Sequence, residues 1–188
     1  MNNTPATVDA RKKNFLTETE MNALMDAARH GRYGTRDYLL VLMAYRHGMR
    51  VSELIDVRMA DLDMDTGRVF VRRKKNSLST SQPIEGDELR AVRAWLRIRG
   101  RTNSPYLFLS ERGPMTRQAI NYLFREIGRR AALPVAVHPH MLRHSTGFFL
   151  ANRGCDTRLI QDYLGHKNIR HTQLYTRTAA TRFEGLWR

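Results

Sequence analysis

Apolar residues recur at the spacing of an α-helix along most of this chain, and the pattern changes to strand-like alternation mainly in one stretch, residues 61–84. A capping box from Thr17 to Glu20 marks the start of the first helical stretch, and Gly48 follows the second. The sequence therefore predicts a mainly α-helical protein with a small β element. We expect helices at about residues 17–31, 35–47, 51–58, 85–100, 116–132, 139–150, 156–164 and 169–176.

The strand-like stretch predicts a small antiparallel hairpin. Residues 68–73 alternate around two valines, and an extended run rich in Ser and Thr follows at 78–84. The turn between them carries Lys74 and Lys75, which either contact a phosphate or simply face solvent. The apolar run at 106–109 is a candidate third strand, which would make a three-stranded sheet.

The charge balance limits the partners of this chain. Its 188 residues include 32 Lys and Arg against 18 Asp and Glu, which gives a net charge of +14 and an isoelectric point near 10.8. An extended polyanion is the natural partner, and nucleic acid is the first candidate. No apolar run approaches the ~20 residues of a membrane span and no signal peptide is evident, so we expect a cytoplasmic protein that does not contact a membrane. The single cysteine, Cys155, agrees with a reducing compartment.

Two basic side chains stand three positions apart in the helical stretch that begins near residue 139. On a helix, residues i and i+3 share a face, so His140 and Arg143 can contact one small anion together. Farther along, His166 follows a glycine that ends a helix, and Tyr175 lies in the last helical stretch. Lone histidines and helical tyrosines are more often structural. A zinc site is the other alternative, but the histidine spacing gives no compact pair of ligands, so we expect no metal.

Arg50 stands at the start of a predicted helix. An arginine gains nothing from the helix dipole there, because that end of a helix favours acids. Two explanations remain, a salt bridge with Glu53 or a functional role.

The order of these residues resembles the tyrosine recombinases, also called phage-type integrases, over nearly the whole chain from about Phe15. Their catalytic domain carries Arg in a Gly-x-Arg-x-Ser-Glu-Leu phrase, Lys, His-x-x-Arg, His or Trp, and Tyr in this order. The resemblance implies the tyrosine-recombinase catalytic domain over residues 14–188, after a flexible basic arm at 1–13, with no separate N-terminal domain. It also implies a catalytic set without metal or cofactor: Arg50, Lys75, His140, Arg143, His166 and the nucleophile Tyr175.

These residue types suit the breaking and rejoining of a DNA phosphodiester. Paired guanidiniums such as Arg50 and Arg143 match the two non-bridging oxygens with bidentate hydrogen bonds. Tyr175 has an ordinary pKa of about 10, so it needs a base or a strong positive field. We expect His140 to act as the base and His166 to donate a hydrogen bond to a non-bridging oxygen.

Two lysines compete for the role of the acid that protonates the leaving 5′ oxygen. The chain looks closest to the fimbrial phase-switch inversion recombinases, on its phrases at residues 139–145, 156–166 and 168–172, and that branch places the lysine at Lys75. Other branches favour Lys74. We expect Lys75 to be the acid. Candidate DNA contacts are then Lys74, Arg117, Gln118, Asn121 and Arg125.

The resemblance also implies partners and a reaction class. The expected substrate is double-stranded DNA with inverted-repeat sites, cleaved by four protomers through a 3′-phosphotyrosine, with accessory DNA-bending proteins as further partners. Inversion that controls fimbrial phase variation and transcription is the favoured outcome, beside integration, excision and resolution. The lack of a second clamping domain predicts salt-sensitive binding. A non-catalytic DNA-binding regulator is the alternative function, and it predicts loss of a catalytic side chain, whereas all are present.

The last residues form a short apolar segment. Phe183, Leu186 and Trp187 are too apolar for a free tail. They pack either into a neighbouring protomer, as in the resembling family, or onto the chain's own core.

Overall fold

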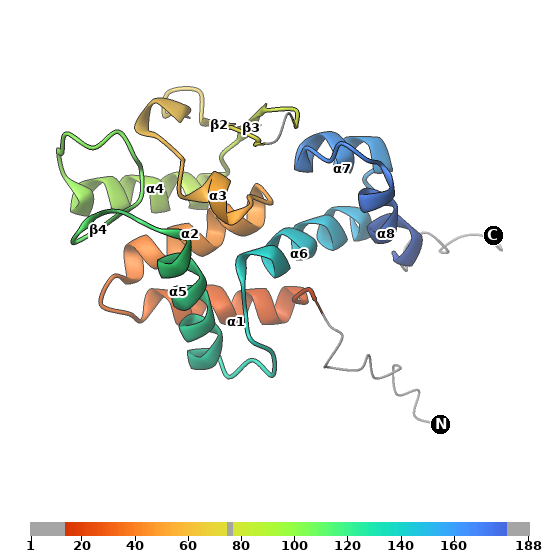
Figure 1. The fold of residues 1–188 in the computed structure, drawn as a ribbon, viewed down its shortest axis with the longest axis horizontal. Helices are drawn as coiled ribbons and strands as arrows, with labels where there is room; N and C mark the ends of the chain where they lie inside the picture. Colours follow the sequence, from red (N-terminus) through yellow and green to blue (C-terminus); the bar gives the residue numbers. More distant parts are fainter. Residues whose placement is uncertain (1–13, 75–76, 180–188) are drawn as a thin grey trace.

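The computed structural model describes residues 14–74 and 77–179. Helices make up most of this part of the chain (Figure 1). They are α1 (Glu18–Arg29), α2 (Gly34–Arg46), α3 (Val51–Leu54), α4 (Gly86–Arg99), α5 (Arg117–Arg130), α6 (Pro139–Asn152), α7 (Thr157–Leu164) and α8 (Arg170–Thr178), with a 3₁₀ turn η1 (Met59–Asp61). None of the described helices combines the length and apolar character that a membrane span requires.

Two small antiparallel sheets accompany the helices. The first has the order β1-β2-β3, from strands β1 (Leu62–Asp63), β2 (Arg68–Val71) and β3 (Thr80–Pro83). The predicted hairpin is β2–β3, in which Val69 pairs with Gln82. The second sheet joins β4 (Leu109–Ser110) to β5 (Gly113–Pro114).

The expected third strand at 106–109 was wrong in position. Leu107 and Phe108 are fully buried core residues, and only the end of that run, at Leu109, enters a strand. That strand pairs with β5 and not with the hairpin, whose third strand is β1. An apolar run indicates that a segment is buried, but a buried strand and a buried segment without strand pairing give the same pattern.

Local chemistry explains where the first helices begin and how deeply they are buried. The Thr17 hydroxyl accepts a hydrogen bond from the Glu20 backbone, and the Glu20 carboxylate accepts one from the Thr17 backbone at 2.8 Å, so the predicted capping box is confirmed. Helix α2 is apolar on most sides, and its residues from Leu39 to Ala44 are at most 1% exposed. It therefore lies at the centre of the protein, between α1, α4 and α6.

The described apolar side chains form two clusters. The main cluster joins α1–α5, the hairpin and the first half of α6. The second is small and contains Ala151, Ile160, Leu164, Tyr175 and Ala179, at the far end of α6 and in the segment that includes α7 and α8. In Figure 1 these last helices stand together beside the end of α6, away from α4 and α5. Helix α6 thus links the two clusters.

Some expectations fall outside the described residues. They concern the arm at residues 1–13, Lys75 on the hairpin, and the apolar side chains Phe183, Leu186 and Trp187.

Candidate active site

Arg50 caps the short helix α3 and keeps part of its guanidinium in solvent. Its Nη1 donates to Glu53 Oε1 at 2.6 Å, and its backbone N–H donates to Glu53 Oε2 at 2.9 Å. The side chain of Arg50 is 30% exposed, whereas that of Glu53 is 1% exposed. The salt bridge that the sequence allowed is therefore present. It fixes one side of the guanidinium and leaves the other accessible to a phosphate.

Arg143, on α6, is almost fully buried. Its Nη1 donates to the Gly48 carbonyl and its Nη2 to the Leu164 carbonyl, both at 2.6 Å. Burial lowers the pKa of Arg143 to about 9, with repulsion from Arg73 and Arg50 adding to the effect. The guanidinium is still charged at neutral pH, so it brings a fixed positive charge to the point where α2, α6 and α7 meet.

Gly48 allows the end of α7 to pack closely against the backbone that follows α2. Its φ of +53° is the left-handed region that suits glycine, and an added Cβ would lie 2.3 Å from a methyl carbon of Leu164. The glycine of the Gly-x-Arg phrase is therefore required by both backbone and packing.

Tyr175 reaches α6 from α8 and is 1% exposed. Its hydroxyl lies 2.9 Å from Nδ1 of His144, and its ring packs on Gly147, one turn farther along α6. Burial raises the pKa of Tyr175, and the charge of Arg143 opposes that rise. In this arrangement the hydroxyl keeps its proton at neutral pH.

His144 contacts Tyr175 and is a candidate site residue that sequence reasoning missed. The catalytic set that the resemblance implies does not include it. It stands four positions after His140, so both share one face of α6, and that spacing was the available signal. Their rings lie 4.8 Å apart. Burial lowers the pKa of His144 to about 4 and, with Arg143, lowers that of His140.

His166 follows the left-handed C-cap of α7 at Gly165. Its Nδ1 lies 2.9 Å from the hydroxyl of Thr172, and its ring centroid lies 6.2 Å from that of Tyr175. Burial, with repulsion from Arg143, lowers the pKa of His166 to about 3. The imidazole is therefore neutral at pH 7 and carries a single ring proton for donation.

Arg73, two residues after the end of β2, is the second candidate residue that sequence reasoning missed. Its side chain is fully buried and donates to Glu53 Oε2 at 2.8 Å. Although burial raises the pKa of Glu53, Arg73 and the hydrogen bonds from Arg50 hold it below its usual range. The strand pattern carried the signal, because Val69, Val71 and Arg73 alternate toward the core.

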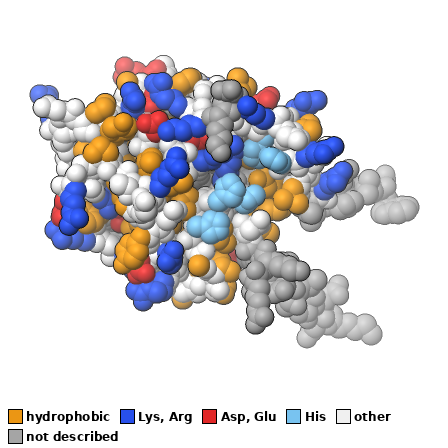
Figure 2. Space-filling view, viewed as in Figure 1, with side chains coloured by type: hydrophobic (Ala, Val, Ile, Leu, Met, Phe, Trp, Pro, Cys, Tyr) orange, Lys and Arg blue, Asp and Glu red, His pale blue; other side chains and the backbone are white. Residues whose placement is uncertain are grey.

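The remaining predicted residues that the structure describes lie on exposed surfaces. Lys74 pairs with Asp56 at 3.2 Å and its side chain is 43% exposed. The predicted DNA contacts on α5 are all exposed, namely Arg117, Gln118, Asn121 and Arg125. Figure 2 shows histidine side chains gathered in one patch, with Lys and Arg side chains near it. Among residues 14–74 and 77–179, no group of three His, Cys, Asp or Glu side chains is arranged to hold a metal ion.

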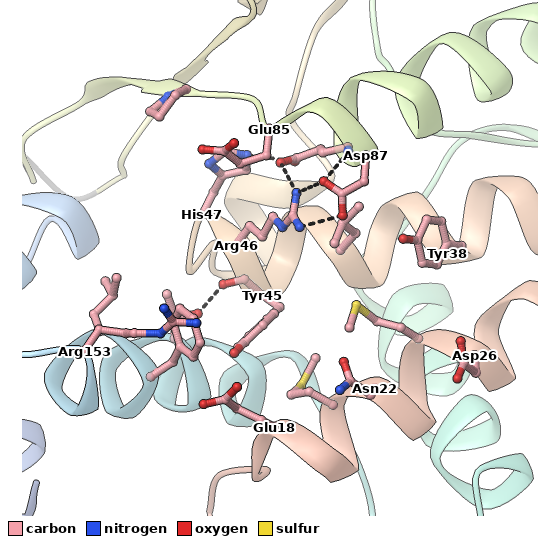
Figure 3. Close-up of a pocket in the computed structure, with 18 of the residues that line it drawn as sticks. Glu18, Asn22, Asp26, Tyr38, Tyr45, Arg46, His47, Glu85, Asp87 and Arg153 are labelled. Carbon is pink, nitrogen blue, oxygen red and sulfur yellow. Dashed lines mark hydrogen bonds and ion pairs between the residues drawn. The ribbon is translucent and has the colours of Figure 1, made fainter. Parts of the chain in front are cut away.

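A separate cavity lies between α1, α2, the start of α4 and the end of α6 (Figure 3). There Arg46 donates to both carboxylate oxygens of Asp87, at 2.6 and 2.7 Å, and Glu18 and Tyr45 line another part of the wall. Its lining, as far as the chain is described, includes none of the predicted catalytic residues. The predicted catalytic residues that the structure describes lie instead around α6.

Sequence comparison places this geometry in a known family. The phage integrase family matches residues 14–182. The type 1 fimbriae regulatory proteins FimE and FimB of Escherichia coli (strain K12) are 49% and 45% identical to the chain, over 94% and 95% of it and 91% and 92% of their own lengths. Tyrosine recombinase XerA of Pyrococcus furiosus is 36% identical over 88% of this chain and 57% of its own length.

Solved structures show the same fold. The crystal structure of XerA recombinase superposes with a TM-score of 0.79 at 30% identity, over 92% of this chain and 61% of the XerA chain, so the protein spans about three fifths of that relative. XerH recombinase bound to a palindromic difH substrate gives a TM-score of 0.77 at 19% identity, over 96% of this chain and 54% of XerH. The predicted mainly helical fold and the predicted family are confirmed. The chain belongs to the phage integrase family and is a tyrosine-type site-specific DNA recombinase.

Proposed function

We propose that this recombinase inverts a DNA segment between two inverted-repeat sites, with Tyr175 as its nucleophile. The observation that supports the role of Tyr175 is its position against α6. There His144 contacts its hydroxyl, and the charge of Arg143 opposes the rise in its pKa that burial causes. The relationship to FimE and FimB, which are named as fimbriae regulatory proteins, supports inversion as the outcome.

The reaction proceeds by exchange of one phosphodiester for another. The Tyr175 oxygen attacks phosphorus and loses its proton to His140, while the 5′ oxygen leaves and takes a proton from Lys75. Arg50 and Arg143 bind the non-bridging oxygens, which gain charge in the transition state. The 3′-phosphotyrosine keeps the energy of the broken bond. Attack by a 5′ hydroxyl of the partner strand then releases Tyr175 and rejoins the DNA.

His166 completes this set as a donor to a non-bridging oxygen. It is neutral at pH 7, and Thr172 holds its Nδ1. When the Thr172 hydroxyl donates to Nδ1, the ring proton is on Nε2, which is then free to face the phosphate.

The assembly that we propose is a tetramer of this chain on two DNA sites, helped by accessory DNA-bending proteins, with residues 14–188 as one catalytic domain. Exposed Arg117, Gln118, Asn121 and Arg125 of α5 are the proposed duplex contacts. Cross-linking on site-containing DNA, with the free protein as control, tests the tetramer.

The decisive experiment is covalent capture. Nicked, site-containing DNA is incubated with the protein in EDTA, and a protein–DNA adduct that survives denaturation is sought. Tyr175→Phe is the matched control, because it keeps the ring on Gly147 and removes only the hydroxyl. An adduct in the wild type alone supports the proposal, whereas an adduct in Tyr175→Phe moves the nucleophile elsewhere. Specific binding without an adduct favours a non-catalytic regulator.

The acid is tested with DNA in which sulfur replaces the leaving 5′ oxygen. A thiolate leaves without protonation, so loss of a general acid slows cleavage of the oxygen substrate and spares the sulfur substrate. Lys75→Ala is expected to show this pattern. If Lys74→Ala shows it instead, the acid is Lys74, which pairs with Asp56 in the absence of DNA.

A further inference from the structure

We propose that Arg73 is a positioning residue for the reaction, which anchors the lysine hairpin to the two catalytic arginines and so aims the hairpin lysine at the leaving oxygen. The inference rests on the proposed role of that lysine as the acid. It adds a buried guanidinium that has no direct contact with DNA in the proposed reaction.

The anchor begins at the base of the hairpin. The backbone N–H of Arg73 donates to the hydroxyl of Ser79 at 3.0 Å, which joins the two sides of the turn. Lys74 follows at once, and its backbone nitrogen lies 3.4 Å from Glu53 Oε1. Hydrogen bonds from these two backbone N–H groups, to Ser79 and to Glu53, therefore fix the chain just before residue 75.

The side chain of Arg73 then reaches the catalytic arginines. Its Nη1 donates to the Gly48 carbonyl at 3.2 Å, the same oxygen that accepts from Arg143. The same Nη1 donates to Glu53, whose other oxygen accepts from Arg50. The Arg73 guanidinium thus shares one hydrogen-bond acceptor with Arg143 and another with Arg50.

The other end of the fork holds two further elements. Nη2 of Arg73 donates to the His47 carbonyl at 2.8 Å and to the Tyr163 carbonyl at 2.6 Å. The His47 carbonyl lies at the end of α2. The Tyr163 carbonyl lies in α7, one residue before the Leu164 carbonyl that accepts from Arg143. The hairpin, the Arg50 turn and the α7 end therefore meet at one guanidinium.

Stability alone is a poor reason for this arrangement. Burial lowers the pKa of Arg73, which means that the protein environment disfavours its charge. A buried ion pair is often no more stable than apolar residues of the same volume. Nε of Arg73 also has no hydrogen-bond partner in the described structure. A rigid planar fork is instead suited to fixing several acceptors in one geometry, which a lysine at the same position cannot reproduce.

Arg73→Lys tests the proposal, because it keeps the positive charge beside Glu53 and loses the fork. Cleavage of oxygen-containing DNA is expected to fall by about 100-fold, the effect of a misplacement of about 1 Å. Cleavage of DNA with sulfur at the leaving position is expected to stay close to the wild-type rate on that substrate. Arg72→Lys is the matched control, since Arg72 precedes it, pairs with Asp61 and is 49% exposed. It is expected to leave both rates unchanged.

Each other outcome overturns the inference. Equal loss on both substrates means that Arg73 serves the phosphate site or the fold, and no loss on either means that it positions nothing. If thermal unfolding shows that Arg73→Lys does not fold, Ser79→Ala is measured in its place. Slower cleavage of the oxygen substrate with normal cleavage of the sulfur substrate supports the proposal, and the absence of this pattern refutes it. The proposal that a hairpin lysine is the acid is refuted separately, if the sulfur substrate restores cleavage in neither Lys74→Ala nor Lys75→Ala.

Discussion

Tyr175 is the proposed nucleophile, yet its side chain is among the most buried of the described residues. The ring lies on Gly147, whose missing side chain makes the space, and the hydroxyl meets His144. Burial raises the pKa of the phenol, so the proposed nucleophile is unreactive until a base and a phosphate reach it.

Gly147→Ala tests how closely this space fits the ring. An added Cβ would lie 2.4 Å from Cε2 of Tyr175, closer than two carbons can approach. We expect the free energy of unfolding to fall by about 1–3 kcal/mol, as is typical for overpacking, measured by urea denaturation. Gly86→Ala is the control, because its Cβ would meet only Arg90, at 3.7 Å. Equal stability of the two variants would contradict the packing that we describe.

Two half-buried histidines predict how stability depends on pH. Folding lowers the pKa of His144 to about 4 and that of His166 to about 3, below the ordinary value of 6.5. The unfolded chain therefore binds more protons between these values, and stability falls as the pH drops from about 6.5 toward 4. We expect the melting temperature of the wild type to decline over this window.

The double variant His144→Asn/His166→Asn should decline less than the wild type over the same window, because its replaced side chains do not titrate. His30→Asn, at an exposed position of the first helix-to-helix turn, is expected to behave like the wild type. Identical curves for the wild type and the double variant would refute the assignment to these two histidines.

Sequence motifs predicted most residues of the candidate site and missed His144 and Arg73, whose contacts join distant parts of the chain. Arg50, His140 and Arg143 lie in short phrases whose spacing carries information. The contact of His144 with Tyr175 joins positions 31 apart, and that of Arg73 with Tyr163 joins positions 90 apart. Local sequence patterns cannot reveal contacts between residues that are so far apart in the chain. The roles of the predicted catalytic residues themselves stay predictions until they are tested.

At the scale of elements, helices were predicted well because caps and glycines mark their ends locally. Helix α1 begins one residue after its predicted cap, and α4 and α5 agree within two residues at each end. The helix expected at 51–58 ends at Leu54 instead. Its later residues lead into the bridge between Arg58 and Tyr106, a long-range contact that periodicity does not reveal.

The end of α7 offers a test of an element boundary. Gly165 has a φ of +66°, and an added Cβ would lie 2.9 Å from Cγ of Arg73. Gly154 has a φ of +79° with open space around it, so Gly154→Ala is expected to lose only the roughly 1–2 kcal/mol of left-handed strain. We expect Gly165→Ala to lose more stability in urea and, unlike Gly154→Ala, to slow DNA cleavage. Similar losses in both variants would show that the Arg73 contact is unimportant.

At the scale of the whole molecule, the net charge of +14 makes DNA affinity sensitive to salt. If Arg117 and Arg125 of α5 each neutralise one phosphate, replacing both with Ala should reduce the slope of log affinity against log salt by about 2. Anisotropy titrations at several salt concentrations measure this slope. Arg129→Ala is the control on the same helix, since Arg129 pairs with Glu126 at 3.0 Å. An unchanged slope would place the duplex elsewhere.

The division of the interior into two apolar clusters bears on how the enzyme moves. Helix α8, which carries Tyr175, packs against α6 and α7 and belongs to the small cluster, whereas α2 lies in the large one. Separating α8 from its neighbours exposes only that small cluster, so it requires less free energy than global unfolding. We expect amide hydrogens of α7 and α8 to exchange with deuterium through local opening, while those of α2 exchange only through global unfolding. Release of the nucleophile would then be a fluctuation already present in the resting protein.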